Sequence, residues 1–506
     1  MIFDRAVPPE GTVRDWLDAR AQTADTAIVF PENGDTLSWR DLRDEARTVA
    51  EGLIGLGIAQ GESVAIVHPN GREGVLALYA ALYGGFRATM INLAAGPDAM
   101  GFALHHSGAP VAFVHASQTD LIRSIAPDGL RVLTPEMLTE RREIPPFDSG
   151  AHALLMYTSG TTGQPKGVVH SHASLLAGGW TTAIAHELSP RDRGFCVLPI
   201  YHINGLCVTV MGALVSGGSL GMVSRFSARN FWDQADSAGI TWFSVVPTII
   251  SHLLHSNTEP SAAARTRLRF GRSASSALAV ETQSAFEERF GVPIIETMGL
   301  TETAAQILSN PLPPGTRKIG SPGIAYGNEV RILASDLTPA PPLQEGEIAV
   351  RGPNVMLEYL DNPEATAKTF AGDWLRTGDL GHIDEDGYVF VTGRLKELII
   401  KGGENIAPRE IDEVLYSQPD IIEAAAFGRP CASYGETIEA AVAVRPGSSL
   451  SETALIELCG QRLGKFKAPD CIHFLDELPK GPSGKIQRLK LAGMIEPRIV
   501  NQRSSA

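Results

Sequence analysis

The segment that most constrains the fold is the loop at residues 157–167, which reads YTSGTTGQPKG. Small or hydroxylated side chains at residues 159–163 leave backbone N–H groups uncovered, and Lys166 follows shortly after them. An apolar run at residues 153–156 precedes the loop, so we expect it to leave the end of a buried strand. Exposed amides, hydroxyls and one ammonium group can together hold a polyphosphate. The spacing is not that of a Walker loop, because a glycine follows the lysine, and a flexible polar turn is the alternative interpretation.

The first third of the chain alternates helix and strand signals. Ser38 and Asp41 form a capping-box pattern ahead of apolar residues at helical spacing, and residues 63–67 and 111–114 have the composition of strands. The same alternation returns between residues 197 and 247. It predicts an α/β fold with helices covering the faces of its sheets. At 506 residues the chain is long enough for about three structural units.

A domain boundary is expected near the sequence GRLKE at residues 393–397. After it comes a compact segment whose length falls within the usual range for a domain. Its helix and strand signals lie at residues 408–416, 424–427, 440–444 and 452–463. We therefore predict a large N-terminal domain at residues 1–394 and a small α+β domain at residues 395–506.

Composition disfavours several classes of protein. The 43 basic and 57 acidic residues give a net charge of −14, which disfavours sequence-independent binding to nucleic acid. The five cysteines show no zinc or disulfide spacing, so a reducing cytoplasm is the expected location. The N-terminus lacks the apolar region of a signal peptide. The densest apolar stretch, residues 206–215, is too short to span a membrane and is predicted to be a buried helix beside a ligand pocket.

The loop at residue 157 is the first of six motifs. The other five are ETMGLTE at 296, RTGD at 376, GRLKE at 393, KGGENIAP at 401 and LPKGPSGKIQR at 478. Their order and spacing resemble the adenylate-forming superfamily of acyl-CoA synthetases, luciferases and peptide-synthetase adenylation domains. The resemblance implies layered α/β subdomains and a β-barrel-like subdomain in the large domain, with a small mobile C-terminal domain. It also implies a reaction in which a carboxylate is joined to the α-phosphate of ATP and then passed to a thiol.

The resemblance further implies which residues bind ATP. The phosphate loop supplies Thr158, Ser159, Gly160, Thr161, Thr162, Gly163 and Lys166. The residues expected around adenine are Ser273, Ala274, Ser275, Glu296, Thr297, Met298 and Gly299. Asp379 and Arg394 are expected at the ribose, since a carboxylate offers two acceptor oxygens to a vicinal diol. Met298 departs from the family, which has an aromatic residue at this position, but a thioether can also pack on a purine.

Catalytic roles are likewise implied for Lys485, Thr301, Glu302 and His202. Lys485 lies in the sequence GPSGKIQR, where two glycines suit a mobile loop, and it is expected to bridge the carboxylate and the α-phosphate. Glu302 is expected to bind a Mg²⁺ ion that bridges ATP phosphates, and Thr301 to hydrogen-bond the α-phosphate. His202 matches a family position between the acyl pocket and the thiol tunnel, with a satisfied core histidine as the alternative.

Three further residues concern the thiol. Lys396 matches the family's hinge, and Gly402 and Gly403 would allow close approach of a pantetheine arm after rotation about it. The sequence KGGENIAP resembles the thiol-transfer loop of stand-alone CoA ligases, which favours coenzyme A over a carrier protein. An adenylation enzyme that loads a carrier protein, and an ATP-binding module without turnover, are the alternatives.

The acid itself is the least constrained part of the prediction. Residues 271–320 resemble oxalyl-CoA synthetases and related small-acid ligases, but those enzymes generally carry histidines where this chain has Asn204 and Ala305. A second anionic group would need other partners, such as serines or Gln306, because an unpaired buried carboxylate is costly. The residues expected in the acyl pocket are His202, Asn204, Ser275 and Ser276. We predict a small polar or anionic acid such as malonate, oxalate or sulfoacetate, with a short fatty or aryl acid as the alternative; assembly into a homo-oligomer is left open.

Overall fold

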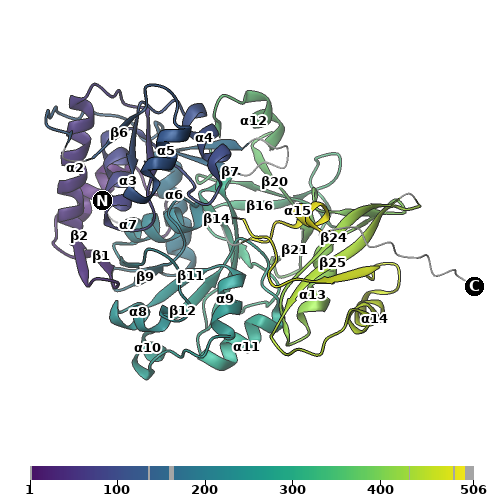
Figure 1. The fold of residues 1–506 in the computed structure, drawn as a ribbon. Helices are drawn as coiled ribbons and strands as arrows, with labels where there is room; N and C mark the ends of the chain where they lie inside the picture. Colours follow the sequence, from purple (N-terminus) through teal and green to yellow (C-terminus); the bar gives the residue numbers. More distant parts are fainter. Residues whose placement is uncertain (1–2, 135–136, 159–164, 432, 482–484, 496–506) are drawn as a thin grey trace, which may run out of the picture.

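The computed structural model covers residues 1–506 and describes all of them except residues 1–2, 135–136, 159–164, 432, 482–484 and 496–506. Two large mixed sheets with helices on their faces form the body of the molecule, and two smaller sheets follow along the chain. Figure 1 shows the C-terminal part, coloured green to yellow, lying against one side of this body.

The seven-stranded sheet carries the strand that leads into the phosphate loop. In spatial order its strands are β18 (Glu358–Tyr359), β8 (Lys166–Ser171), β7 (His152–Thr158), β4 (Arg87–Met90), β3 (Ser63–Val67), β5 (Val111–Val114) and β6 (Arg131–Leu133). Side chains of β3 alternate between two core clusters. Val64 and Ile66 join the cluster of α2 (Trp39–Gly55) and α3 (Arg72–Gly84), and Ala65 joins that of α4 (Pro97–His106) and α5 (Thr119–Ile125). Burial on both faces explains the uninterrupted apolar run of β3.

The nine-stranded sheet brings the other motifs to one edge. Its strands are β15 (Ile324–Ala325), β14 (Ala305–Ser309), β13 (Ile294–Leu300), β12 (Phe270–Ser273), β11 (Trp242–Val245), β9 (Arg193–Cys196), β10 (Ser219–Met222), β1 (Thr26–Phe30) and β2 (Asp35–Ser38). Strands β9, β11, β12 and β13 are parallel neighbours, so their carboxyl ends meet at one edge, where ligands of α/β sheets commonly bind.

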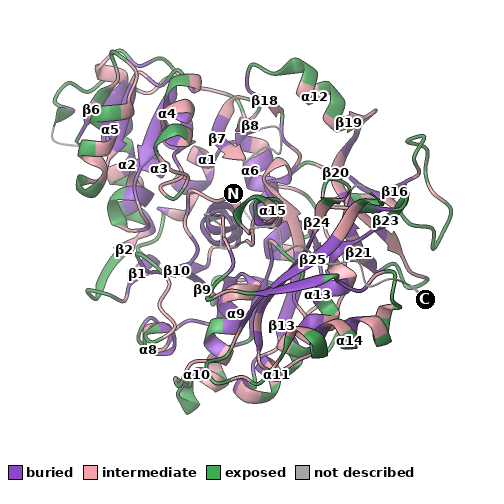
Figure 2. Cartoon of the chain, turned by 45° about the vertical axis from the view of Figure 1, so that its right-hand side comes forward, coloured by how far each residue is buried: buried purple, intermediate pink, exposed green. Residues whose placement is uncertain are grey.

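Helices cover both faces of this second sheet. One face packs on α6 (His172–Ala185), the π-helix η3 (Asn204–Met211) and α7 (Gly212–Ser216). The other packs on α8 (Phe231–Ser237), α9 (Pro247–Leu254) and α11 (Val280–Phe290). Figure 2 shows the result, with purple buried strands beneath helices whose outer sides are green and exposed.

The two smaller sheets complete the chain. The first contains β16 (Glu329–Leu333), β17 (Gly346–Arg351), β20 (Trp374–Ile383), β19 (Phe370–Ala371) and β21 (Val389–Arg394), all antiparallel. The second contains β23 (Glu404–Ile406), β22 (Ile399–Lys401), β25 (Gly435–Val444), β24 (Ile421–Cys431) and β26 (Cys471–Phe474). Helices α13 (Pro408–Tyr416) and α14 (Glu452–Leu463) share a core with one face of this last sheet, and α15 (Arg488–Met494) shares a core with the other.

The predicted α/β fold class, with a large N-terminal part and a small C-terminal α+β part, is confirmed. The β-barrel-like subdomain stays a prediction; the large part ends in the antiparallel sheet of β16, β17, β19, β20 and β21. Ser38 caps α2 as predicted, accepting a hydrogen bond from the Asp41 amide. The strand signal at residues 424–427 marks the centre of a longer strand, β24, and the signal at residues 440–444 marks the C-terminal half of β25. The apolar stretch at residues 206–215 is buried and helical, but most of it is a π-helix rather than an α-helix.

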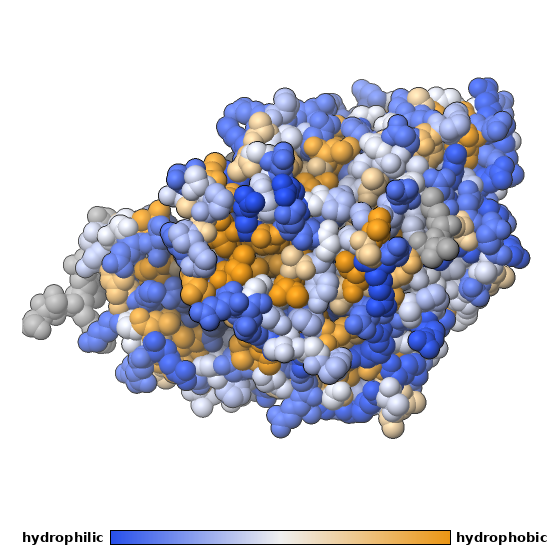
Figure 3. All heavy atoms as spheres, turned by 180° about the vertical axis from the view of Figure 1, so that it is seen from behind, coloured by the Kyte–Doolittle hydropathy of each residue, from blue (hydrophilic) through white to orange (hydrophobic). Residues whose placement is uncertain are grey.

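The surface is mixed in character. On the face seen in Figure 3, orange apolar areas are bordered by blue charged and polar side chains. In the described part of the chain, no helix combines the length and the apolar character that crossing a membrane requires.

Candidate active site

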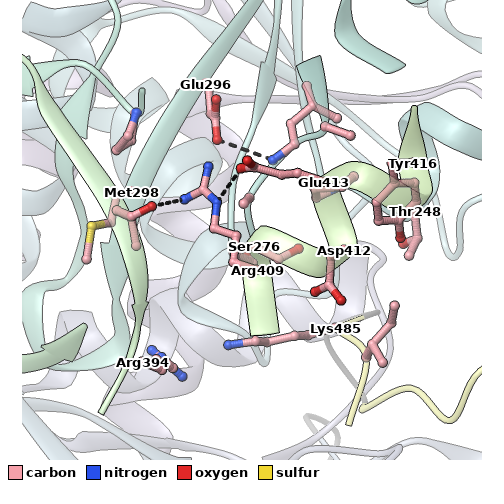
Figure 4. Close-up of a pocket in the computed structure, with 18 of the residues that line it drawn as sticks. Thr248, Ser276, Glu296, Met298, Arg394, Arg409, Asp412, Glu413, Tyr416 and Lys485 are labelled. Atoms are coloured by element: carbon pink, nitrogen blue, oxygen red, sulfur yellow. Dashed lines mark hydrogen bonds and ion pairs between the residues drawn. The ribbon is translucent and has the colours of Figure 1, made fainter. Parts of the chain in front are cut away.

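A cavity of about 230 Å³ lies between the body and the C-terminal segment. Its walls come from α9, the carboxyl end of β13, the β20–β21 pair, α13 and the segment around Lys485 (Figure 4). Nine of the residues predicted from sequence line it: Ser275, Ser276, Glu296, Thr297, Met298, Gly299, Asp379, Arg394 and Lys485. These residues are far apart in the chain, and the fold brings them to one place.

Consecutive residues of β13 form the wall predicted for adenine. The Glu296 carboxylate is buried and accepts a hydrogen bond from the Leu278 amide at 3.2 Å, and burial raises its pKa. The Met298 side chain is half-buried at the cavity wall. The Thr297 hydroxyl donates to the Ser273 carbonyl at 3.2 Å, which ties β13 to the end of β12. Ser273 and its neighbour Ala274 are themselves buried beneath this wall and do not line the cavity.

The two residues predicted for the ribose form an ion pair. Asp379 on β20 and Arg394 on β21 are cross-strand partners, and Arg394 Nε lies 2.5 Å from Asp379 Oδ1. Burial alone would lower the pKa of Arg394, but the charge and hydrogen bond of Asp379 outweigh burial and raise it. The second carboxylate oxygen lies 3.4 Å from Arg394 Nη2, a longer contact that leaves it able to accept further hydrogen bonds.

Lys485 lines the same cavity as Asp379 and Arg394. Figure 4 shows its ammonium group pointing toward Arg394. Burial, and after it the charge of Arg394, lower the pKa of Lys485 to about 8, although the carboxylates of Glu397 and Asp379 act in the opposite direction. A desolvated ammonium group therefore lies close to Asp379 and Arg394, the two residues predicted to bind the ribose, where it could bind an anion.

Thr301 and Glu302 lie on the short 3-10 helix η4 (Thr301–Thr303), which follows β13 directly. His170 Nε2 lies 2.7 Å from the Thr301 carbonyl oxygen, and because a carbonyl only accepts, this nitrogen carries the proton. Burial lowers the pKa of His170 to about 4, so the ring is neutral. The Asn354 side chain donates to the Thr303 carbonyl at 2.8 Å. Two distant parts of the chain therefore fix the backbone on which Thr301 and Glu302 are presented.

Tyr359 links Glu302 to the lysine of the phosphate loop. Its hydroxyl donates to Glu302 Oε1 at 2.8 Å, and Lys166 Nζ lies 4.5 Å from the centre of its ring. The ammonium group is therefore held over an aromatic face while the phenol orients the carboxylate. Tyr359 was not predicted from the sequence, because it lies in no motif that suggests ligand chemistry.

The phosphate loop itself is described only at its ends. Thr158 ends the buried strand β7 and Lys166 begins β8, and the two residues pair across these antiparallel strands. The prediction that the loop leaves the end of a buried strand is therefore confirmed. The remaining predicted phosphate ligands, Ser159, Gly160, Thr161, Thr162 and Gly163, lie outside the described residues.

The chemistry of Glu302 fits a Mg²⁺ ion. Magnesium in nucleotide sites commonly takes one or two protein carboxylates together with substrate phosphates and water. The Glu302 side chain is partly exposed near Lys166, and its Oε2 carries no hydrogen bond to any residue within the described ranges. The residue could therefore hold the ion while Tyr359 holds its other oxygen.

Of the residues predicted for the acyl pocket, two line the cavity and two lie behind its wall. Ser275 and Ser276 line the cavity, and Ser275 lies 3.4 Å from Asn204 Nδ2 at the start of η3. His202 lies just before that helix with its ring 5.1 Å from the Tyr201 ring, and it does not line the cavity. Behind Asn204 lies Arg272, a fully buried arginine on β12 that was not predicted from the sequence. Its only signal was a charged residue inside an apolar strand.

The residues predicted for the thiol step lie outside the cavity. Lys396 is exposed in the turn between β21 and β22. Gly402 and Gly403 form the tight turn between β22 and β23 with φ of +61° and +86°, values that glycine adopts without strain. In this arrangement Lys485 faces the cavity and the glycine turn lies away from it.

Comparison with known proteins agrees with this geometry. Residues 16–360 match the AMP-binding enzyme family, and residues 410–485 match the AMP-binding enzyme C-terminal domain. Sulfoacetate–CoA ligase of Cupriavidus necator is 44% identical over 92% of this chain and 94% of its own length. Oxalate–CoA ligase of Arabidopsis thaliana is 35% identical over 88% of this chain and 91% of its own length.

A solved structure gives the same picture. O-succinylbenzoate coenzyme A synthetase from Bacillus subtilis, in complex with ATP and a magnesium ion, superimposes with a TM-score of 0.83 at 29% identity and covers 94% of this chain and 98% of its own. The chain therefore belongs to the AMP-binding enzyme family and is an acid–thiol ligase of the AMP-forming acyl-CoA synthetase type. The predicted resemblance to small-acid CoA ligases is confirmed.

Proposed function

We propose that this ligase activates a small polar or anionic carboxylic acid with ATP and Mg²⁺ and transfers the acyl group to coenzyme A. In the first step a carboxylate oxygen of the acid attacks the α-phosphorus of ATP, and pyrophosphate leaves. In the second step the thiolate sulfur of coenzyme A attacks the acyl carbonyl carbon, and AMP leaves with the electrons of the broken C–O bond. The observation that carries this proposal is the presence of Lys485 in one cavity with Asp379 and Arg394.

The first step requires two anions to approach each other. Asp379 accepts hydrogen bonds from the ribose hydroxyls, which fixes the nucleotide relative to β20. Lys485 then contributes an ammonium group between the acid and the α-phosphate. Its pKa of about 8 already leaves it largely protonated at neutral pH, and the bound anions favour the charged form further. Glu302 would hold Mg²⁺, which supplies positive charge at the phosphates.

The second step requires a different arrangement of the C-terminal segment. We infer that residues 395–506 move as a unit about Lys396, with the domain boundary between residues 394 and 395. Such a rotation would withdraw Lys485 and bring Gly402 and Gly403 toward the acyl adenylate. The absence of side chains at both glycines suits the approach of a narrow pantetheine arm.

The identity of the acid is proposed from the polar wall behind Ser275. Asn204, Ser275 and Ser276 offer hydrogen-bond donors at the end of the cavity where an acyl group would lie. The relatives named for sulfoacetate and oxalate support a small acid with a second polar group.

The five cysteines are all free thiols, which supports the cytoplasm as the place of action.

A panel of acids tests the proposal. Release of AMP is measured with ATP and Mg²⁺, with and without coenzyme A, for sulfoacetate, malonate, oxalate, propionate and benzoate. We expect AMP release that requires both the acid and coenzyme A. Acid-dependent ATP–pyrophosphate exchange without any release that depends on coenzyme A would contradict the proposal and favour loading of a carrier protein.

A further inference from the structure

Arg272 is a buried charge without a charged partner. It lies in the middle of the nine-stranded sheet, on β12, and its side chain is only 1% exposed. Arginine is rarely buried to this extent unless a carboxylate accompanies it, because removing the charge from water is costly. Within the described part of the chain, no carboxylate forms an ion pair with Arg272.

The partners of this guanidinium are neutral oxygens. Nη1 donates to Asn204 Oδ1 at 2.9 Å and to the Ser244 hydroxyl at 3.1 Å, and Nε donates to Gln306 Oε1 at 3.3 Å. These contacts satisfy hydrogen bonds but leave the positive charge uncompensated, and burial lowers the pKa of Arg272 to about 9. The site therefore has one positive charge more than its protein neighbours balance.

The hydrogen bonds lead from this charge to the cavity. Because Asn204 directs Oδ1 at Arg272, its amide nitrogen is turned the other way, and Nδ2 lies 3.4 Å from the Ser275 hydroxyl. Ser275 lines the cavity, where its φ of +76° holds it in a conformation that is uncommon for a side-chain-bearing residue. The Ser275 hydroxyl therefore lies at the cavity, the Asn204 amide lies directly behind it, and the positive charge of Arg272 lies behind both.

We propose that Arg272, Asn204 and Ser275, here called the anion cluster, recognise a second acidic group on the acid that is activated. This inference rests on the proposed function and narrows the substrate to a dianion, with a carboxylate that reacts and a sulfonate or carboxylate that binds the cluster. Hydrogen bonds from charged or polarised donors to an oxyanion are the strong kind, and a sulfonate or carboxylate oxygen can accept from both the amide and the hydroxyl. Removing the second acidic group of the substrate from water is costly, and the uncompensated positive charge of Arg272 offsets that cost. It takes the place of the histidines that related enzymes carry where this chain has Asn204 and Ala305.

A purely structural role for Arg272 makes a different prediction. In that case the side chain only ties η3, β11 and β14 to β12, and its loss would impair the protein with every acid alike. Arg193 provides a control: it is half-buried rather than fully buried, but its hydrogen bonds also go to neutral groups, Ser219 and the Ala238 carbonyl, and it lies at the amino end of β9 in the same sheet.

The experiment compares kcat/KM for sulfoacetate and malonate with that for propionate, in coenzyme A-dependent AMP release. For Arg272→Met we expect the dianion-to-propionate ratio to fall about 100-fold through KM for the dianion, and for Arg272→Lys to fall less. Arg193→Gln should leave the ratio unchanged. An unchanged ratio in Arg272→Met, with equal losses for all acids, would overturn the proposal.

A second variant keeps Arg272 in place, so this test does not require the protein to fold without that arginine. Asn204→Asp supplies Arg272 with a carboxylate of nearly the same shape, so the fold should be retained, but the cluster is then neutralised and repels an anion. We expect turnover of dianions to fall relative to that of propionate, and a dianion-to-propionate ratio at or above the wild-type value would overturn the proposal.

The wild-type enzyme distinguishes this proposal from the proposed function. If it uses propionate or benzoate but no dianion, the role proposed for the anion cluster is wrong while the ligase function stands. If no acid supports AMP release, the proposed function itself fails.

Discussion

Replacing Tyr359 with phenylalanine removes one hydroxyl group and keeps the ring beneath Lys166. The lost hydrogen bond joins the phenol to Glu302 Oε1 at 2.8 Å, and the Tyr359 side chain is 5% exposed. A hydrogen bond to a charged acceptor contributes about 1.5–3 kcal/mol. Because about 1.4 kcal/mol corresponds to a factor of ten, we expect the adenylation rate to fall about 10- to 100-fold.

The assay is acid-dependent ATP–pyrophosphate exchange, measured over a range of Mg²⁺ concentrations. If Tyr359 orients Glu302 for the ion, Tyr359→Phe should need more Mg²⁺ to reach half of its maximal rate. The phenylalanine ring still supports Lys166, so the affinity for pyrophosphate should change less than the dependence on Mg²⁺.

Tyr388→Phe is the matched control. Tyr388 also lies beneath a lysine, Lys318 at 4.7 Å, but its hydroxyl donates to the neutral Thr316 carbonyl, away from the cavity. This variant should keep the wild-type dependence on Mg²⁺. The reasoning is refuted if Tyr359→Phe keeps both the wild-type rate and the wild-type Mg²⁺ dependence, or if the control shifts that dependence as far as the test variant does.

Three further outcomes follow from the site. Lys485→Ala should slow adenylation about 100- to 1,000-fold while ATP still binds in a direct binding assay, and unchanged exchange would show that Lys485 is not the bridging residue. Folding lowers the pKa of Lys485 from 10.5 to about 8, so between these two pH values the unfolded chain binds a proton that the folded chain does not. The unfolding free energy of the wild type should therefore rise between pH 8 and 10.5 relative to that of Lys485→Met. A difference between the two proteins that stays constant with pH would contradict the burial of this charge. Gly178→Ala should destabilise the protein by about 1–3 kcal/mol in denaturant unfolding, since the new methyl group would meet Ala304 and, at 2.6 Å, Cys207 Sγ, whereas Gly493→Ala on the exposed face of α15 should not destabilise it.

The sequence by itself determined the elements whose signals are local. Helices α13 and α14 begin and end where the sequence predicts, because apolar side chains that recur with the period of a helix all lie on the face that packs against the sheet. The motifs likewise singled out Asp379, Arg394 and Lys485 as candidate site residues, and the fold places all three at one cavity.

Only the tertiary structure decided which distant side chains complete the site. Tyr359 reaches Glu302 across 57 positions, and Arg272 reaches Asn204 across 68. Neither pairing leaves a periodic pattern in the chain, because the contact arises from the packing of separate strands and helices. The π-helix η3 is a further case. Its apolar residues predict a buried helix, but the sequence does not distinguish a π-helix from an α-helix, and the packing against the neighbouring sheet decides between them.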